Sequence, residues 1–300
     1  MTTSEGPAPG SFKLIDPFLN LPPEPGSVKI TDPNMRRWFR GSQHMLEGAS
    51  FEDTIAEMDK AGIEKGMLLT AGKSANPHPG GPWKVGMDIT DEAFLTACET
   101  LADWSKRSNG RLFPQIWIDP AEGMKAVYRL EQAVKDFNCV AAHLMPAMTG
   151  LVANHRSYYP VYAKASELGI PVKINCGFPG PSTKMGYTQR TLNLDEICVA
   201  FPDLIVVATH VGHPWQLETV AMLQKHANFR LITSGFAPKH VPEEIWRVAN
   251  TRAQNKVMWS SDFPVLPMDR CAREGWEVPL RGHVLPLYLR ENALETFKLG

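Results

Sequence analysis

The sequence predicts a (β/α)8 barrel, in which eight parallel strands alternate with about eight helices. The first observation is a repeated unit, in which a short apolar run is followed by a loop and an amphipathic helical stretch. The second is that several apolar runs are continuous, as expected for parallel strands covered on both faces. The third is length, because 300 residues with 43% hydrophobic content can bury one large core.

Eight segments are predicted to be strands, and they are spread over the whole chain. They are residues 12–18, 66–71, 111–118, 139–145, 171–176, 204–210, 229–234 and 256–261. An open doubly wound sheet is the alternative, but no G-x-G-x-x-G sequence follows the first strand and eight units are many for that fold. No linker interrupts the pattern. We therefore expect one domain over residues 1–300, with residues 1–11 as a flexible tail.

Helices are predicted from apolar residues three and four positions apart and from capping residues. In the segment 50–62, Ser50 can cap the N-terminus and Gly62 can end the helix. Phe51 and Ile55 share one face of this helix. Six further segments show a similar pattern: 91–110, 121–137, 158–169, 216–226, 242–254 and 284–297.

The predicted loops differ in length between the two ends of the barrel. The loops 72–88, 177–193 and 262–282 are long and rich in Gly and Pro, whereas the connections at the other end are short. In such barrels the long loops follow the strands and build the C-terminal face, where active sites lie. The asymmetry favours an enzyme over a structural scaffold.

Composition excludes several classes of partner. The net charge is −1 with Lys and Arg scattered, so we expect neither nucleic acid nor a membrane surface as a partner. No signal peptide or membrane span is indicated. The five cysteines are widely spaced and form no C-x-x-C pair, which is typical of reduced thiols in a cytoplasmic protein. The expected partner is a small-molecule substrate, and a homodimer is one option for the assembly.

Polar side chains gather at the predicted C-terminal ends of the strands, which a barrel presents to a ligand. They are Asp16, Asn20, Gln115, Asp119, His143, Lys173, Asn175, Thr209, His210, His213, Thr233, Ser234, Ser260, Ser261 and Asp262. An imidazole after the sixth strand and a carboxylate after the eighth can act as an acid–base pair or as metal ligands. His210 and Asp262 are therefore the central candidates.

Five segments, in the same order, resemble the amidohydrolase superfamily: 51–69, 158–174, 201–215, 255–264 and 289–299. They include a His-x-Gly sequence at 210–212 and Ser-Asp-Phe-Pro at 261–264. The chain looks most like the amidohydrolase-related branch, which contains aminocarboxymuconate-semialdehyde decarboxylase, aromatic-acid decarboxylases and pyrone-dicarboxylate lactonase. The resemblance covers nearly the whole chain and implies a distorted TIM barrel.

The resemblance also implies a divalent metal, but this sequence keeps only part of the ligand set. His210 and Asp262 match family ligand positions, whereas Phe18 and Asn20 replace the histidine pair of the first strand and Asn175 replaces the histidine of the fifth. A phenyl ring offers no lone pair, an amide oxygen is a weak ligand for zinc, and a catalytic zinc site needs about three good protein ligands. We expect no catalytic metal and no other cofactor.

Other residues could take part in the site. His143 and His213 could in principle rebuild a metal site, although neither stands at a family ligand position. Alternation places Lys173 on the same strand face as Asn175, one layer deeper, where an ammonium could stabilise a substrate carboxylate or an oxyanion. Desolvation would lower its pKa and also allow a general-base or Schiff-base role.

Each candidate also has a purely structural interpretation. A strand-end amide or imidazole often only bonds backbone groups, and Lys173 could extend outward or pair with Asp16. Cys176 is a conceivable nucleophile but is more simply a buried thiol. Trp83 could line an apolar pocket or pack within the loop layer.

Three functions remain open at this point. The leading hypothesis is a metal-independent hydrolase of a small cyclic or unsaturated ester, lactone or activated C–C bond. Asp262 would be its general base, with His210 and Lys173 stabilising the oxyanion. The second is a lyase that decarboxylates or hydrates an aromatic or unsaturated acid. The third is an inactive ligand-binding barrel.

Overall fold

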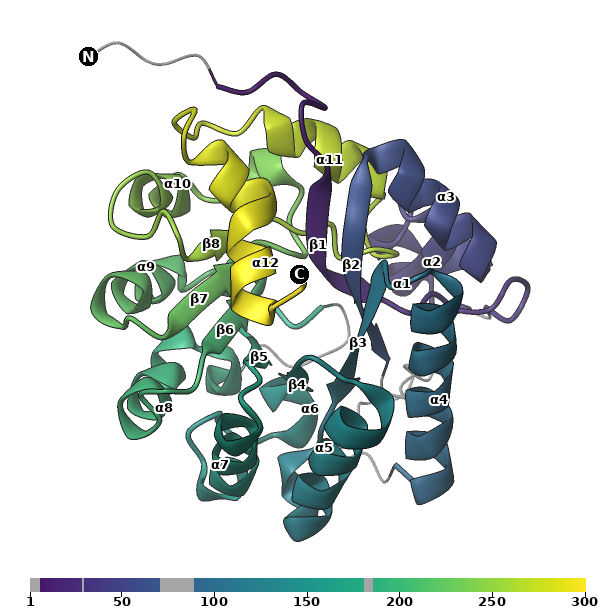
Figure 1. Ribbon diagram of the computed structural model, residues 1–300, viewed down its shortest axis with the longest axis vertical. Coiled ribbons are helices and arrows are strands. Elements are labelled where there is room, and N and C mark those ends of the chain that lie inside the picture. Colours follow the sequence, from purple (N-terminus) through teal and green to yellow (C-terminus); the bar gives the residue numbers. More distant parts are fainter. Residues whose placement is uncertain (1–5, 29, 71–88, 181–185) are drawn as a thin grey trace.

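The computed structural model describes residues 6–28, 30–70, 89–180 and 186–300. Eight parallel strands form one sheet in sequence order, curved into a nearly closed barrel with helices outside it (Figure 1). The predicted fold class is confirmed. The strands are β1 (Leu14–Asn20), β2 (Ile63–Thr70), β3 (Leu112–Trp117), β4 (Ala142–Leu144), β5 (Val172–Asn175), β6 (Val206–Thr209), β7 (Phe229–Ile232) and β8 (Val257–Met258).

Seven helices lie within the predicted segments. They are α3 (Phe51–Ala61), α4 (Asp91–Arg107), α5 (Met124–Phe137), α7 (Tyr159–Leu168), α9 (Gln216–Lys225), α10 (Glu243–Ala249) and α12 (Asn292–Phe297). A π-helical turn, η8 (Leu287–Glu291), precedes α12. Short 3-10 turns are η2 (Pro120–Glu122), η3 (Arg156–Tyr158), η4 (Tyr187–Gln189), η5 (Thr191–Leu194), η6 (His210–Gly212) and η7 (Pro238–His240).

Five helices were not predicted: α1 (Pro33–Trp38), α2 (Gln43–Glu47), α6 (Pro146–Thr149), α8 (Asp195–Ala200) and α11 (Met268–Trp276). The prediction of 262–282 as a loop was wrong for its middle part. Helix α11 forms there because Met268 and Cys271 are completely buried on one side of it. Its Gly275 allows close packing on Trp259, since a Cβ atom at this glycine would lie 3.0 Å from the indole Nε1.

Helix α3 shows how local sequence sets an element. The Ser50 side chain accepts a hydrogen bond from the backbone of Asp53, whose carboxylate accepts one from the backbone of Ser50. This reciprocal pair satisfies two N–H groups that a helix start leaves without partners. Gly62 ends the helix with φ of 73°, a left-handed conformation that costs glycine little.

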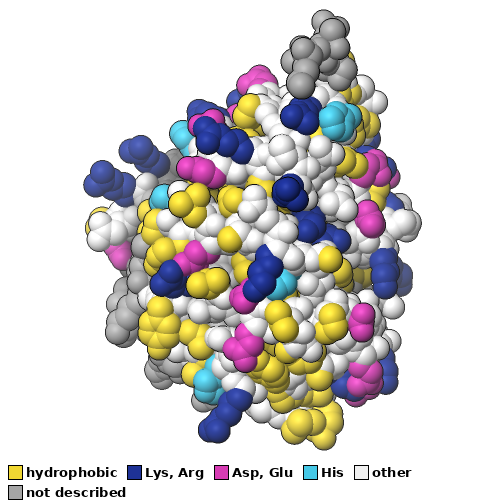
Figure 2. Space-filling view, turned by 90° about the vertical axis from the view of Figure 1, so that its left-hand side faces the viewer, with side chains coloured by type: hydrophobic (Ala, Val, Ile, Leu, Met, Phe, Trp, Pro, Cys, Tyr) yellow, Lys and Arg dark blue, Asp and Glu magenta, His cyan; other side chains and the backbone are white. Residues whose placement is uncertain are grey.

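The outer surface carries mixed charge. Figure 2 shows one side of the molecule, where Lys and Arg side chains are interspersed with Asp and Glu. None of the helices in the described ranges is long and apolar enough to cross a membrane.

The barrel closes between β1 and β8 mainly through hydrogen bonds that involve side chains. Within the described ranges, strand pairing runs from β1 to β8 and does not join β8 back to β1. The buried Asp16 carboxylate bridges this seam: it accepts hydrogen bonds from the Ser260 hydroxyl, from the Ser261 hydroxyl at 2.5 Å and from the Ser261 backbone N–H at 3.1 Å. Burial raises the pKa of Asp16 to about 6.

Strand β1 is irregular next to this seam. Asp16 pairs with Gly66 of β2, but Leu19 pairs with Leu68, so β1 advances one residue more than its neighbour. Pro17 lies in this bulge, where the absence of an N–H group is tolerated. Beyond it, the Asn20 N–H donates to the Phe263 carbonyl at 2.7 Å, which ties the end of β1 to the segment after β8.

We predict that Asp16→Asn destabilises the protein by about 2 kcal/mol or more, because the amide leaves a buried N–H or hydroxyl donor of Ser261 without an acceptor. Thermal and urea unfolding would measure the change. Asp103→Asn, at an exposed carboxylate of α4 that forms an ion pair with Arg107, is the control and should change stability by less than about 0.5 kcal/mol. Equal effects of the two substitutions would contradict the role of the seam.

Candidate active site

A cavity of about 550 Å³ opens where β5, β6 and β8 end. Most of its lining side chains are apolar or aromatic, and the polar ones come from strand ends. The lining residues are Met35, Trp38, Phe39, Asn175, Phe178, Pro179, Gly180, His210, His213, Gly235, Phe236, Asp262 and Val265. Trp38 of α1 stacks on Phe178 with ring centroids 5.3 Å apart and planes 9° from parallel. The volume and the flat walls suit a small planar molecule.

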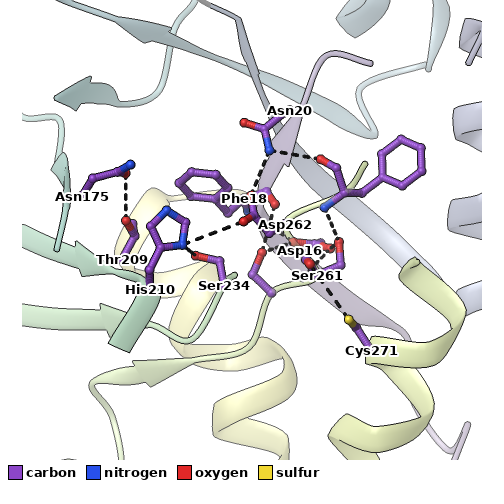
Figure 3. A network of polar contacts seen from close by, with 12 residues as sticks. Asp16, Phe18, Asn20, Asn175, Thr209, His210, Ser234, Ser261, Asp262 and Cys271 are labelled. Atoms are coloured by element: carbon purple, nitrogen blue, oxygen red, sulfur yellow. Dashed lines mark hydrogen bonds and ion pairs between the residues drawn. The ribbon is translucent and has the colours of Figure 1, made fainter. Parts of the chain in front are cut away.

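Asp262 and His210 face each other on this cavity (Figure 3). Both have left-handed backbone conformations, with φ of 61° and 63°, which are uncommon for residues other than glycine. An Asp262 carboxylate oxygen lies 3.9 Å from His210 Nδ1. Gly235 makes room for the imidazole, because a Cβ atom at that position would lie 2.7 Å from His210 Nδ1.

Neighbouring side chains fix the orientation of this pair. The Asn20 amide donates to the Asp262 carboxylate at 2.8 Å, and the Ser234 hydroxyl lies 3.1 Å from His210 Nδ1 (Figure 3). The Asn175 side-chain oxygen accepts from the Thr209 hydroxyl at 3.0 Å, which leaves its amide N–H groups for another acceptor.

Burial moves the pKa values of the pair in opposite directions. It raises the pKa of Asp262 to about 7, assisted by the nearby negative charge of Asp16 and opposed by the Asn20 hydrogen bond. It lowers the pKa of His210 to about 4. Near neutral pH, His210 is therefore an uncharged imidazole, whereas Asp262 exchanges a proton. Such a separation is typical of an acid–base site.

Lys173 lies below the cavity and does not line it. The predicted strand face is correct, because the side chain is completely buried inside the barrel. Its ammonium donates to the Pro17 carbonyl and to the Gln115 side-chain oxygen, both at 2.6 Å. It therefore neither extends outward nor pairs with Asp16, whose carboxylate bonds Ser260 and Ser261 instead. Burial lowers the pKa of Lys173 well below its ordinary value, and the nearby negative charges of Asp16 and Asp262 oppose this shift and favour the ammonium form.

Phe18 and His143 fill the space beside Lys173. The Phe18 ring meets the rings of His143 and His210 edge-on, each at a centroid distance of 5.2 Å. His143 is completely buried, and neither of its ring nitrogens has a hydrogen-bond partner among the described residues. Burial lowers the pKa of His143 well below its ordinary value. Its imidazole is therefore uncharged.

The remaining candidates differ in position. His213 lines the cavity, edge-on to Phe236 at 5.9 Å. Cys176 is buried and does not line it, and burial raises the pKa of its thiol to about 12, so the protonated form dominates at neutral pH. Trp83 lies outside the described residues. Sequence reasoning missed Trp38, because α1 was not predicted.

The described residues do not fit a catalytic metal. They contain no group of three or more His, Cys, Asp and Glu side chains placed to share one ion. At the ligand positions implied by the family, the Phe18 ring has no donor atom, and the amides of Asn20 and Asn175 are engaged with Asp262 and Thr209. No catalytic step is therefore assigned to a metal here.

Solved structures share this fold over almost the whole chain. An uncharacterised TIM-barrel protein from Bordetella bronchiseptica is 22% identical with a TM-score of 0.76, and the match covers 96% of this chain and 99% of the other. The 5-carboxyvanillate decarboxylase from Sphingomonas paucimobilis is 16% identical with a TM-score of 0.73, and the match covers 97% of this chain and 100% of the other. The corresponding enzyme from Novosphingobium aromaticivorans was solved in complex with manganese and 4-hydroxy-3-methoxy-5-nitrobenzoic acid. It is 16% identical with a TM-score of 0.74, and the match covers 99% of each chain.

These identities establish the fold alone. No curated protein matches the chain. The family model described as Amidohydrolase, however, matches residues 42–299. The match spans β2 to β8 and both members of the Asp262–His210 pair. It begins after β1 and after the cavity-lining residues Met35, Trp38 and Phe39. This chain belongs to the amidohydrolase family.

Proposed function

We propose that this protein is a lyase that removes the carboxylate of a small aromatic acid as CO2. The observation that carries the proposal is a carboxyl group, Asp262, whose burial raises its pKa to about 7 in a cavity with aromatic walls. Membership of the family indicates an enzyme. Decarboxylases of aromatic acids among proteins of the same fold support this reaction type over the hydrolysis that the sequence favours.

Protonated Asp262 is the acid in this proposal. Its proton moves to the ring carbon that bears the substrate carboxylate. The bond from that carbon to the carboxylate then breaks, its electron pair restores the aromatic ring, and CO2 leaves. Asp262, now a carboxylate, takes a proton from solvent, so one proton is consumed for each CO2 released. A ring hydroxyl ortho or para to the carboxylate makes that carbon basic enough to accept the proton.

A bound carboxylate would keep Asp262 in the required form. Like charges at short distance raise the pKa of the weaker acid, so a substrate carboxylate beside Asp262 favours its protonated state. The N–H groups of Asn175 and the neutral imidazole of His210 supply hydrogen-bond donors, and the His213 side chain lines the same cavity. None of the described residues lining the cavity is Lys or Arg, so no cationic side chain there balances the negative charge of the substrate carboxylate. That negative charge disappears when the carboxylate leaves as CO2.

Hydrolysis of an ester or lactone is the second candidate. The same pKa leaves part of Asp262 ionised at neutral pH, where the carboxylate can take a proton from water. Both candidates use Asp262, but they need it in opposite protonation states.

Asp262→Asn should lower decarboxylation of hydroxybenzoic acids by about 100-fold or more, because the amide cannot deliver a proton. CO2 release from a panel of such acids, with deuterium incorporation from D2O at the vacated ring carbon, measures the reaction. Asp203→Asn, at an exposed carboxylate before β6, is the control and should retain full activity. If esters or lactones are consumed and no acid in the panel releases CO2, the hydrolase interpretation is correct.

The pH dependence separates the two candidates. A decarboxylase that needs protonated Asp262 should lose kcat/KM as pH rises through about 7, whereas a hydrolase that needs the carboxylate should gain it. Asn20→Ala removes a hydrogen bond that stabilises the carboxylate, so it raises the pKa and moves the midpoint to higher pH. Asn255→Ala, an exposed amide, should leave the profile unchanged. A midpoint unmoved by Asn20→Ala would contradict the assignment to Asp262.

A further inference from the structure

The surroundings of Lys173 are those of an ammonium ion. Among the described residues, three acceptors lie close to its nitrogen: the Pro17 carbonyl and the Gln115 side-chain oxygen at 2.6 Å, and the Phe18 ring face at 4.1 Å. The Phe297 ring lies farther away, at 5.9 Å. The Gln115 amide nitrogen donates to the Met67 carbonyl at 2.8 Å, which directs the amide oxygen toward Lys173. Three acceptors match the three N–H donors of an ammonium, whereas a neutral amine would leave its lone pair facing one of them.

This group lies at the centre of the barrel. Lys173 on β5 is the register partner of His143 on β4, and Asn175 follows two residues later on the same strand. The Phe18 ring from β1 contacts the ammonium at 4.1 Å and meets the rings of His143 and His210 edge-on, each at 5.2 Å. An ion shared by these imidazoles would have to displace the phenyl ring.

We propose that the Lys173 ammonium and the Phe18 ring occupy the place of the metal centre, so that this protein holds no divalent ion at the barrel mouth. The ammonium carries the internal positive charge, and the phenyl ring fills the space beside it. A divalent cation entering this space would meet a fixed positive charge in a low-dielectric interior, where like charges repel strongly.

Asn20 and Asn175, which stand at two further ligand positions of the family, are also consistent with a site that holds no metal. Asn20 binds the carboxylate of Asp262 and Asn175 binds the hydroxyl of Thr209, so each amide has a partner within the protein. Such contacts also restrain Asp262, which a metal would otherwise hold. The inference concerns metal binding alone and does not depend on which reaction the protein catalyses.

Metal binding by the wild-type protein is the first test. Protein purified without chelator, analysed by mass spectrometry for metals and titrated with MnCl2 and ZnCl2 by calorimetry, should contain less than about 0.1 equivalent and show no saturable site. About one equivalent in the wild type, lost in both His210→Ala and Asp262→Ala, would overturn the proposal. Metal retained in those two variants would lie elsewhere and leave the proposal standing.

Restoring the ligands is the second test. A variant with Phe18→His, Asn20→His and Asn175→His should bind Mn²⁺ or Zn²⁺ about tenfold or more tightly once Lys173→Met is added, because the repelling charge is gone. Circular dichroism first verifies that each variant is folded. Equal affinity with and without Lys173→Met, or no binding by the folded fourfold variant, would overturn the assignment. If the variants do not fold, the wild-type titration still decides.

Discussion

The structure depends on one buried carboxylate, Asp16, which joins the first strand of the barrel to the last. Neighbouring strands elsewhere are joined by a backbone ladder, whereas this seam is joined by the carboxylate and by the backbone hydrogen bond from Asn20 to Phe263. The partners Ser260 and Ser261 directly precede Asp262. The same contact that closes the barrel therefore places the candidate acid. Burial is the main cause of the raised pKa of Asp262, and the charge of Asp16 adds to it, so the seam positions that group and contributes to its proton affinity.

The interior beside the seam is unusually polar for a barrel core. Lys173, Gln115 and His143 are all completely buried, and a buried polar group is tolerated when its hydrogen bonds are made inside the protein. Lys173 and Gln115 meet this condition. His143 does not among the described residues, so its nitrogens are available to a bound molecule or to water.

The sequence predicts the fold well because its signals are repeated. Apolar runs, several of them continuous, indicate all eight strands, and the strand ends indicate Asp262 and His210 as candidates. Helix α8 is too short to show periodicity, and prolines and a glycine obscured α11.

The partners of Lys173 could not be predicted either. The alternation of side chains along a strand shows which face Lys173 lies on, but not which residues it contacts there. The Pro17 carbonyl reaches the Lys173 nitrogen because β1 bulges at this point. The aromatic wall formed by Trp38 and Phe178 depends on a tertiary contact between segments far apart in the chain.

The proposed chemistry requires that Asp262 exchanges a proton near neutral pH. The most direct measurement is a ¹³C NMR titration of the aspartate side-chain carboxyls in the free protein, with Asp262→Asn used to assign the resonance. We expect a midpoint of about 7 for Asp262. A midpoint near the ordinary value of 3.8 would contradict it, because Asp262 would then be a permanent carboxylate at neutral pH and could not be the acid.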